Sequence, residues 1–232
     1  MGKRTPRKGR SFSISYGSKT FRIYIKGGLH LKALDLFCGL GGWSDGLAKE
    51  GFEVLGVEIE PHIAELYKHP IIVEDVRNLK PEDFKGYDLI VGSPPCRDFT
   101  KIPDVRYKDG NGYKITPWKE PKNPDRGLEL VLNYLKFVKV AEPTYWVLEN
   151  VVGLTKHLHI KPRLVTRLSK GMKRAFWGNF PPFLVTRDFS LTPKEKIQGK
   201  LRRWERAKIP IAFSQALGRA VVSHITNKEG TT

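Results

Sequence analysis

From Leu31 onward, short apolar runs alternate with stretches of helical pattern. Candidate helices begin near Trp43 and near Pro61, where proline suits a first helical position. This alternation predicts a parallel sheet connected by crossover helices, that is, an α/β fold. The predicted strands are Leu31–Phe37, Glu53–Glu58, Pro70–Val73, Tyr87–Gly92 and Thr144–Leu148.

The clearest helical pattern runs from Arg126 to Val140. We expect its apolar residues to share one face against the core, and these are Leu128, Val131, Leu132, Leu135 and Val138. Beyond Thr155 the pattern weakens. The elements expected there are short strands over Met172–Trp177 and Phe183–Thr186, a charged helix near Pro193–Arg206, and a last helix over Pro210–Ile225.

Residues 1–28 follow a different pattern. Gly2–Arg10 is a block of like charges that should repel itself and stay flexible until an anion neutralises it. Ser11–Ile25 alternates apolar and polar residues about a turn at Tyr16–Lys19, which predicts a β-hairpin. We therefore divide the chain into a basic tail with a hairpin over 1–28 and a main domain over 29–232.

One long segment between the fourth strand and the Arg126 helix lacks periodicity. Lys101–Asp125 is rich in Lys, Pro, Gly and Asp. Loops of this length inside compact domains are usually either functional lids or disordered. We therefore keep both interpretations for this loop.

Charge is the strongest compositional signal. The chain has 41 Lys and Arg against 24 Asp and Glu, a formal net charge of +17 at pH 7. Net charge carries no information about the fold, but a value this large favours a polyanion partner, most commonly nucleic acid. The alternative is a lysine-rich solvated surface of the kind found in heat-adapted proteins.

Cysteine content and hydropathy narrow the class of protein. With two cysteines, Cys38 and Cys96, the chain builds neither a disulfide framework nor a four-cysteine zinc site, and we expect no metal centre. No apolar run approaches the roughly 18 residues that a membrane span needs. We therefore expect a cytoplasmic protein outside the membrane. A cysteine with a chemical role in it would act without a second cysteine.

A glycine-rich segment, Asp35–Gly42, follows the first predicted strand and precedes a helix. Doubly wound sheets bind nucleotide-like ligands at this position, because glycines permit the turn and let a ligand approach the backbone. Glu58 ends the next strand 19 residues after Gly39, close to the spacing of roughly 20 typical of an acid that holds ribose hydroxyls. The alternative is a tight strand-to-helix turn without a ligand.

Two further acids indicate which ligand to expect. Asp45 falls in the first turn of the following helix, where it would repel a pyrophosphate. A ligand with ribose and adenine but no phosphate fits better, and S-adenosylmethionine is such a ligand. Asp75 comes just after the third strand and is placed to accept a hydrogen bond from an adenine amino group; the alternative is a simple surface acid.

The fourth strand is followed by Ser93-Pro94-Pro95-Cys96. A pyrimidine C5 carbon is not nucleophilic until a group adds to C6, and a cysteine is the strongest side-chain nucleophile near neutral pH. An acid that pairs with the pyrimidine N3 must neutralise the charge that develops on the ring, and Glu149 ends the fifth strand at the same sheet edge. The alternative for an isolated cysteine is a small buried hydrophobe.

Together these residues resemble the DNA (cytosine-5) methyltransferase family. The resemblance rests on Asp35–Gly42, Gly56–Pro61, Ser93–Cys96 and Leu148–Val151, and it extends in order and spacing from Leu31 to about Leu154. It implies a Rossmann-like sheet that binds S-adenosylmethionine. It also implies that Cys96 attacks C6 of a flipped or unpaired cytosine, that Glu149 contacts N3, and that the loop Lys101–Asp125 closes over the base.

The resemblance also assigns the cofactor contacts residue by residue. The expected cofactor-binding residues are Asp35, Phe37, Gly39, Leu40, Gly41, Glu58, Ile59, Asp75, Val76 and Pro95. The product left in the same site would be S-adenosylhomocysteine.

The second half of the chain departs from the family pattern. Of the family's Gln-x-Arg-x-Arg element, only Arg174 is in place, as the expected support for the cytosine O2. Between Trp177 and Leu191 there is no room for a separate target-recognition domain, so we expect only a short remnant at about 155–190. We expect the N-terminal tail and hairpin, the Lys101–Asp125 loop and the basic run Lys161–Arg174 to share the DNA contacts instead.

The sequence therefore favours a DNA (cytosine-5) methyltransferase, of the restriction-modification type, associated with the nucleoid of a prokaryotic or viral system through its DNA. Two alternatives remain open. One is an RNA methyltransferase with the same chemistry, acting on structured RNA such as tRNA. The other is a non-catalytic nucleic-acid-binding relative or a subunit of a modification complex, which the intact Cys96 and Glu149 disfavour.

Overall fold

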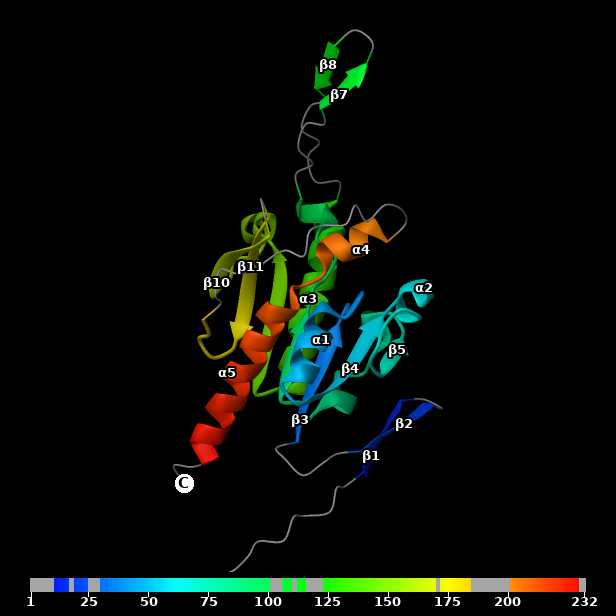
Figure 1. Cartoon of the computed structure of the whole chain (residues 1–232), viewed down its shortest axis with the longest axis vertical. Helices are drawn as coiled ribbons and strands as arrows, with labels where there is room; N and C mark the ends of the chain where they lie inside the picture. The colour runs from blue at the N-terminus through cyan, green and yellow to red at the C-terminus, as the bar shows by residue number, and fades with distance from the viewer. Residues whose placement is uncertain are drawn as a thin grey trace, which may run out of the picture.

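The computed structural model describes eight parts of the chain (Figure 1). These are residues 11–16, 19–24, 30–100, 106–109, 112–115, 123–169, 172–184 and 201–229. Its centre is a seven-stranded sheet with helices on both faces, which confirms the predicted α/β class.

The sheet has the strand order β10-β11-β9-β6-β3-β4-β5. Five strands run parallel, and they are β3 (Leu31–Leu36), β4 (Phe52–Glu58), β5 (Ile71–Val73), β6 (Leu89–Gly92) and β9 (Tyr145–Val151). β11 (Met172–Asn179) is antiparallel to β9, and β10 (Leu164–Ser169) is antiparallel to β11. β4 and β5 follow β3 on one side of it, and β6, the next strand along the chain, lies on the other side of β3. A crevice at the carboxyl ends of β3 and β6 follows from this reversal.

The five predicted strands are confirmed as β3, β4, β5, β6 and β9. They could be predicted because apolar residues line both faces of the central strands, as is typical of a parallel sheet covered on both sides. The fifth strand is longer than predicted, so that Glu149 lies within β9 rather than at its last residue. Strand β10 was not predicted, since its sequence, Leu-Val-Thr-Arg-Leu-Ser, mixes charge with apolar residues. No strand forms at Phe183 and Leu184, the described part of the strand predicted over Phe183–Thr186.

Helix α3 (Pro124–Ala141) covers one face of the sheet. The Tyr134 hydroxyl donates to the carbonyl oxygens of Ile90 and Val147 at 2.9 and 2.8 Å, which holds the helix over β6 and β9. The predicted core face needs one correction, because Leu132 is 51% exposed. Tyr134 and Phe137 are buried in the core instead, so the buried face of the helix is rotated away from Leu132 toward these two aromatic residues.

Helices α1 (Gly42–Lys49) and α5 (Ile211–Glu229) cover the other face, in front of the sheet in Figure 1. The start of α1 passes so close to the chain before α5 that a Cβ on Gly42 would lie 2.5 Å from the Ile209 backbone nitrogen. Ser214 Oγ donates to the Gly42 carbonyl oxygen at 2.9 Å. The C-terminal helix is therefore tied to the segment that follows the glycine turn.

Shorter elements connect or surround the sheet. They are the helices α2 (Pro61–Ala64) and α4 (Arg202–Ala207) and the 3-10 turns η1 (Val76–Asn78), η2 (Pro81–Phe84), η3 (Arg97–Phe99) and η4 (Val152–Lys156). Only the end of the charged helix predicted near Pro193–Arg206 falls in the described residues, where it forms α4. The helix predicted over Pro210–Ile225 is confirmed as α5 and extends to Glu229.

Two small hairpins stand apart from the sheet in hydrogen bonding. β1 (Ser11–Tyr16) pairs with β2 (Lys19–Tyr24), which confirms the hairpin expected near the N-terminus. β7 (Arg106–Asp109) pairs with β8 (Gly112–Ile115) inside the segment that showed no periodicity. The basic tail over residues 1–10 and the rest of the Lys101–Asp125 loop up to residue 122 lie outside the described residues. None of the described helices has the length and apolar character that crossing a membrane requires.

Candidate active site at the carboxyl edge of the sheet

A pocket of about 860 Å³ opens where the chain reverses, at the carboxyl ends of β3 and β6. This volume lies in the range typical of sites for small ligands. The predicted residues that line the pocket are Phe37, Gly39, Leu40, Glu58, Ile59, Asp75, Val76, Pro95, Cys96, Glu149 and Arg174. Cofactor candidates and base candidates therefore share one cavity. Of the predicted site residues, Asp35 and Gly41 do not line it.

The glycine turn after β3 has an unusual backbone. Gly39 and Gly41 have φ values of +52° and +74°, in the left-handed region that favours glycine, and Phe37 adopts φ +60° despite its side chain. The Gly41 amide donates to the Cys38 carbonyl oxygen at 2.9 Å, and the Cys38 amide donates to the Val57 carbonyl oxygen at 2.9 Å. The turn is thus fixed to itself and to β4.

Glu58 connects the end of β4 to this turn. Its Oε2 accepts from the Gly39 amide and its Oε1 from the Glu60 amide, both at 3.0 Å. Burial raises the pKa of the Glu58 carboxyl, and the backbone hydrogen bonds oppose that rise. The two residues whose spacing predicted a ribose-binding acid, Gly39 and Glu58, are thus in direct contact through a hydrogen bond.

Asp35 lies behind the turn rather than in the pocket wall. Its side chain is fully buried, Oδ2 accepts from the Ser44 hydroxyl at 2.6 Å, and Oδ1 has no hydrogen-bond partner. The Ser44 hydroxyl also lies 2.5 Å from the Tyr67 hydroxyl. Burial raises the pKa of Asp35 to about 7. Asp35 thus joins β3 to α1 across the turn and supports its conformation from behind.

The adenine-side candidates are at the ends of β4 and β5. Ile59 is 55% exposed and Val76 is buried, and both line the pocket. The Asp75 carboxylate accepts from the Arg77 guanidinium, with the shortest contact, Nη2 to Oδ2, at 2.6 Å. This pairing holds the pKa of Asp75 below its usual value. Asp75 is therefore an ionised acceptor, already paired with one cation.

Asp45 is in the first turn of α1, as predicted, but it is not an isolated negative charge. Lys208 Nζ lies 2.9 Å from Oδ2, and His69 Nε2 lies 3.1 Å from Oδ1. These partners hold the pKa of the Asp45 carboxyl below its usual value. Because Lys208 compensates the charge, repulsion by Asp45 is a weaker reason to exclude a phosphate than the sequence indicated.

The Pro-Pro-Cys turn after β6 is fixed to β9. The side-chain amide of Asn150 donates to the Pro94 carbonyl oxygen at 3.0 Å in a buried contact. The Cys96 carbonyl oxygen accepts from the Thr100 hydroxyl at 2.8 Å and from the Phe99 amide at 3.1 Å. The Cys96 side chain is itself half-buried and lines the pocket. Asn150 thus holds the turn that carries Cys96 beside the strand that carries Glu149.

Glu149 and Arg174 form a buried ion pair on neighbouring strands. Arg174 Nη1 lies 3.2 Å from Glu149 Oε1, and both side chains are at most 5% exposed. The contact lacks hydrogen-bond geometry, so the buried Oε1 has no hydrogen-bond partner. Burial raises the pKa of Glu149, whereas Arg174 and a hydrogen bond with Ser93 lower it. The pair therefore offers an acid that is easier to protonate than an exposed glutamate.

Sequence reasoning missed the residues that cover the pocket beside the glycine turn. Trp204 in α4 lies over the glycine turn, where a Cβ on Gly39 would be 3.5 Å from its ring. The Arg203 guanidinium stacks on Trp204 at 4.8 Å from the ring centroid, and Arg203 Nη2 lies 3.7 Å from Glu60 Oε1. No spacing or motif in the charged stretch before α5 could have indicated that Trp204 returns to the glycine turn.

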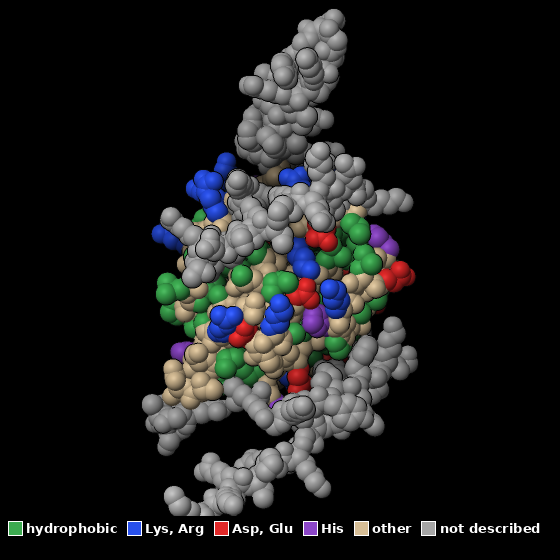
Figure 2. Space-filling model, in the orientation of Figure 1, with side chains coloured by type: hydrophobic (Ala, Val, Ile, Leu, Met, Phe, Trp, Pro, Cys, Tyr) green, Lys and Arg blue, Asp and Glu red, His purple; other side chains and the backbone are tan. Residues whose placement is uncertain are grey.

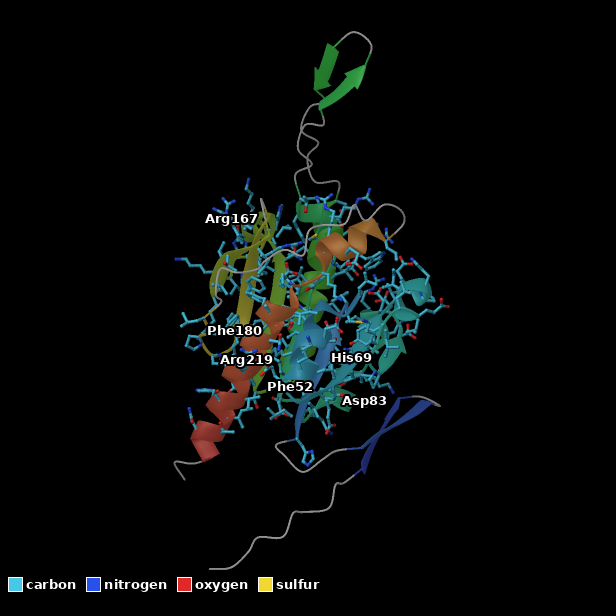
Figure 3. All side chains as sticks on the ribbon, viewed as in Figure 1. Phe52, His69, Asp83, Arg167, Phe180 and Arg219 are labelled. Atoms are coloured by element: carbon cyan, nitrogen blue, oxygen red, sulfur yellow. The ribbon has the colours of Figure 1, made fainter. Side chains whose placement is uncertain are left out.

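The side chains of the site are shown among all others in Figure 3. In the part of the chain that the structure describes, no group of three or more His, Cys, Asp or Glu residues could hold a metal ion. The polar groups of the pocket are instead carboxylates, arginines and one thiol.

Comparison with curated proteins returns type II methyltransferases. The type II methyltransferase M1.HphI of Haemophilus parahaemolyticus is 30% identical over 164 residues, covering 66% of this chain and 40% of the relative. The type II methyltransferase M.DdeI of Desulfomicrobium norvegicum is 31% identical over 134 residues, covering 53% and 28%. The chain thus spans less than half the length of these two relatives.

Among solved structures, the S. pombe Dnmt2 methyltransferase is 20% identical, with a TM-score of 0.38 over 55% of this chain and 36% of that one. A family model, that of the C-5 cytosine-specific DNA methylases, matches residues 31–173. The matched range contains the glycine turn, the Pro-Pro-Cys turn and Glu149, and it ends one residue before Arg174. The chain therefore belongs to the C-5 cytosine-specific DNA methylase family.

Proposed function

We propose that this protein transfers a methyl group from S-adenosylmethionine to C5 of cytosine in DNA. One observation carries the proposal: a single pocket contains Cys96, the buried Glu149–Arg174 pair, and the glycine turn with Glu58. A nucleophile, an acid and a cofactor cradle thus face the same space. Membership of the C-5 cytosine-specific DNA methylase family and the type II methyltransferases among the relatives support the same reaction.

The residues present fit S-adenosylmethionine. Each oxygen of Glu58 accepts one backbone amide, which leaves further lone pairs for hydroxyl donors such as those of a ribose. Asp75 and Val76 would hold the adenine, and the backbone of Gly39 and Leu40 would face the methionine portion. When bound, the cofactor supplies an electrophilic methyl group. The product, S-adenosylhomocysteine, would occupy the same contacts.

Cys96 and Glu149 would activate the cytosine ring together. The Cys96 thiolate adds to C6, and Glu149 donates a proton to N3 as electron density moves into the ring, so that C5 becomes nucleophilic. After C5 has received the methyl group, solvent water takes the C5 proton. Elimination of the Cys96 thiolate then restores the C5–C6 double bond, and N3 returns its proton to Glu149. The raised pKa of Glu149 suits this task, because the residue must carry a proton near neutral pH.

Arg174 would serve the same base from the other side of Glu149. Its guanidinium is already fixed near Glu149 Oε1, and a planar guanidinium has several N–H groups available for a second acceptor such as the cytosine O2. A base inside a duplex presents neither its ring face nor N3 to the pocket. The cytosine must therefore leave the stack before Cys96 can reach C6.

Domain organisation and target remain proposals of the same kind. We propose that residues 29–232 form one methyltransferase domain, and that β10 and β11 occupy part of the region at about 155–190 that was expected to hold a remnant of a recognition domain. Both strands belong to the main sheet. Contacts to DNA would then come from this edge of the sheet together with the N-terminal residues 1–28 and the loop Lys101–Asp125.

The experiment that tests the proposal measures transfer of labelled methyl groups from S-adenosylmethionine to duplex DNA, single-stranded DNA and tRNA. We expect label in DNA with the parent and none with Cys96→Ala, while Cys38→Ala, which removes the other thiol, keeps activity. A duplex with 5-fluorocytosine should trap a covalent adduct with the parent only, because fluorine cannot leave C5 as a proton does. Full transfer without Cys96 would exclude the mechanism, and label in tRNA alone would change the substrate.

A further inference from the structure

The edge of the sheet beside the pocket has a highly uneven charge distribution. From Asn150 to Arg187 the chain contains eight Lys and Arg residues and no Asp or Glu. This stretch forms η4, β10 and β11, next to Glu149. Lys and Arg side chains gather at the upper edge over β10 and β11 in Figure 2, where Arg167 is labelled in Figure 3. Residues 1–28 likewise contain eight Lys and Arg residues and no acid, so this stretch is one of two such basic regions, and it is the one that lies beside Glu149.

Within this stretch two cations face each other directly. Arg167 on β10 is the cross-strand partner of Lys173 on β11, and residues that are paired in this way project from the same face of an antiparallel ladder. Both residues are exposed, and neither forms an ion pair with any residue that the structure describes. Like charges placed opposite each other destabilise a hairpin, so this arrangement favours an anion between them.

The pair lies one residue beyond the catalytic candidates. Arg174, the residue after Lys173, projects to the opposite face and into the pocket, where it meets Glu149. In the ladder Arg174 pairs with Val151 and Phe176 with Glu149, so Lys173 extends past the end of β9 at the carboxyl edge. Arg167 and Lys173 do not line the pocket, so an anion held by them would lie outside it, at the same carboxyl edge of the sheet and one strand residue from Arg174.

We propose that Arg167 and Lys173 form a clamp for one backbone phosphate of the DNA strand that carries the target cytosine. The proposal rests on the proposed function for the identity of the polyanion. The clamp would bind DNA without regard to sequence, since phosphate contacts position a nucleic acid while base contacts specify it. It would hold the strand at this edge of the sheet while the cytosine enters the pocket. In this chain the sheet edge itself would thereby supply part of the contact surface.

The test measures DNA affinity at several salt concentrations for the full chain and for the double variant Arg167→Gln, Lys173→Gln. Loss of one phosphate contact should reduce the slope of log Kobs against log salt by about 0.9 for duplex DNA. We expect affinity at low salt to fall about tenfold, irrespective of sequence. The affinity for S-adenosylmethionine, measured by calorimetry without DNA, should stay unchanged. Because a like-charge pair is removed, the melting temperature should stay equal or rise slightly.

The matched control is the double variant Lys49→Gln, Lys80→Gln. Both lysines are exposed, neither forms an ion pair with a described residue, and they lie away from the pocket, at the end of α1 and before η2. The control removes the same net charge of two and should change the slope far less. Equal slopes for the two double variants would overturn the clamp. If the parent still methylates DNA in that case, the proposed function stands and only the clamp fails.

Discussion

Glu58 and Glu149 occupy matching places on the two sides of the pocket, yet their surroundings differ. Each lies toward the carboxyl end of a parallel strand, β4 and β9, and each is buried, with its pKa raised by burial. Glu58 accepts one backbone amide on each oxygen, whereas Glu149 faces an arginine and has one oxygen without a hydrogen-bond partner. The side proposed to bind the cofactor is thus fixed by backbone amides, and the side proposed to receive the base is fixed by side chains.

The hydrogen-bond partners of a buried acid, more than its burial, indicate the role that the acid can take. Backbone amides favour the ionised form and fix its direction, so Glu58 is built to accept hydrogen bonds from hydroxyl donors. Glu149 has no backbone amide on its carboxylate among the hydrogen bonds described; burial raises its pKa, and Arg174 and Ser93 oppose that rise. An acid that must donate and regain a proton benefits from a side-chain partner such as Arg174, because a small shift of that side chain changes the pKa of the acid.

The largest expected effect comes from Glu149→Gln. Glutamine keeps the size and can still contact N3, but it cannot donate a proton as an acid. We expect kcat for methyl transfer to fall by about 10²- to 10⁴-fold, the usual contribution of general acid catalysis. The affinity for S-adenosylmethionine, measured by calorimetry, should remain within about twofold of the parent. A variant that loses cofactor affinity and keeps kcat would reverse the roles assigned to the two acids.

Glu58→Gln should give the opposite pattern. Its amide cannot accept on both sides, so one of the contacts to Gly39 and Glu60 is lost together with the charge. Hydrogen bonds to charged groups are worth about 1.5–3 kcal/mol each, which corresponds to a loss of about 10- to 100-fold in cofactor affinity. At saturating cofactor, kcat should recover most of its parent value. Calorimetry and kinetics on one preparation separate the two quantities.

Trp204 tests whether the cofactor side is closed by the chain before α5. Replacing Trp204 with Ala removes the ring over Gly39 and the surface on which Arg203 stacks, so we expect cofactor affinity to fall about five- to tenfold. Trp204→Phe keeps an aromatic face and should bind within about twofold of the parent. Intrinsic fluorescence should respond to cofactor in the parent and respond less in both variants. Equal affinity in Trp204→Ala would show that α4 does not take part.

Much of the sheet and both acids could be predicted from local pattern. Apolar runs mark strands that are buried on both faces, and the carboxyl ends of parallel strands meet at one edge, so Cys96 and Glu149 could be placed together. The spacing of Glu58 from Gly39 anticipated a relation that the structure shows as a hydrogen bond at 3.0 Å. These inferences depend only on neighbours in sequence or in the ladder.

What could not be predicted depends on contacts between distant segments. Trp204 returns to a turn 165 residues earlier, a contact that no periodicity encodes. The partners of Asp45 and Asp75 changed the electrostatic interpretation of both acids, since Lys208 and Arg77 compensate their negative charges. Leu132 fitted the helical spacing but is exposed, because Tyr134 fills the space over β6 and β9. Packing between elements decided each of these cases.

The smallest expected effect on cofactor affinity comes from Asp35→Asn. Asp35 shows that a buried carboxylate near a strand end need not line the pocket. It too is a buried carboxylate near a strand end, with its pKa raised to about 7, but it lies outside the pocket wall and accepts from Ser44. Because the folded-state pKa of Asp35 lies above its ordinary value of 3.8, the folded state binds more protons than the unfolded chain between these values, and stability falls as pH rises from about 4 to about 7. Asp35→Asn should flatten this dependence by at most about 1.4 kcal/mol per pH unit, measured by urea unfolding at pH 5 to 8. Cofactor affinity should change less than in Glu58→Gln. A loss as large as that of Glu58→Gln would mean that the support behind the turn matters as much as the contact in front of it.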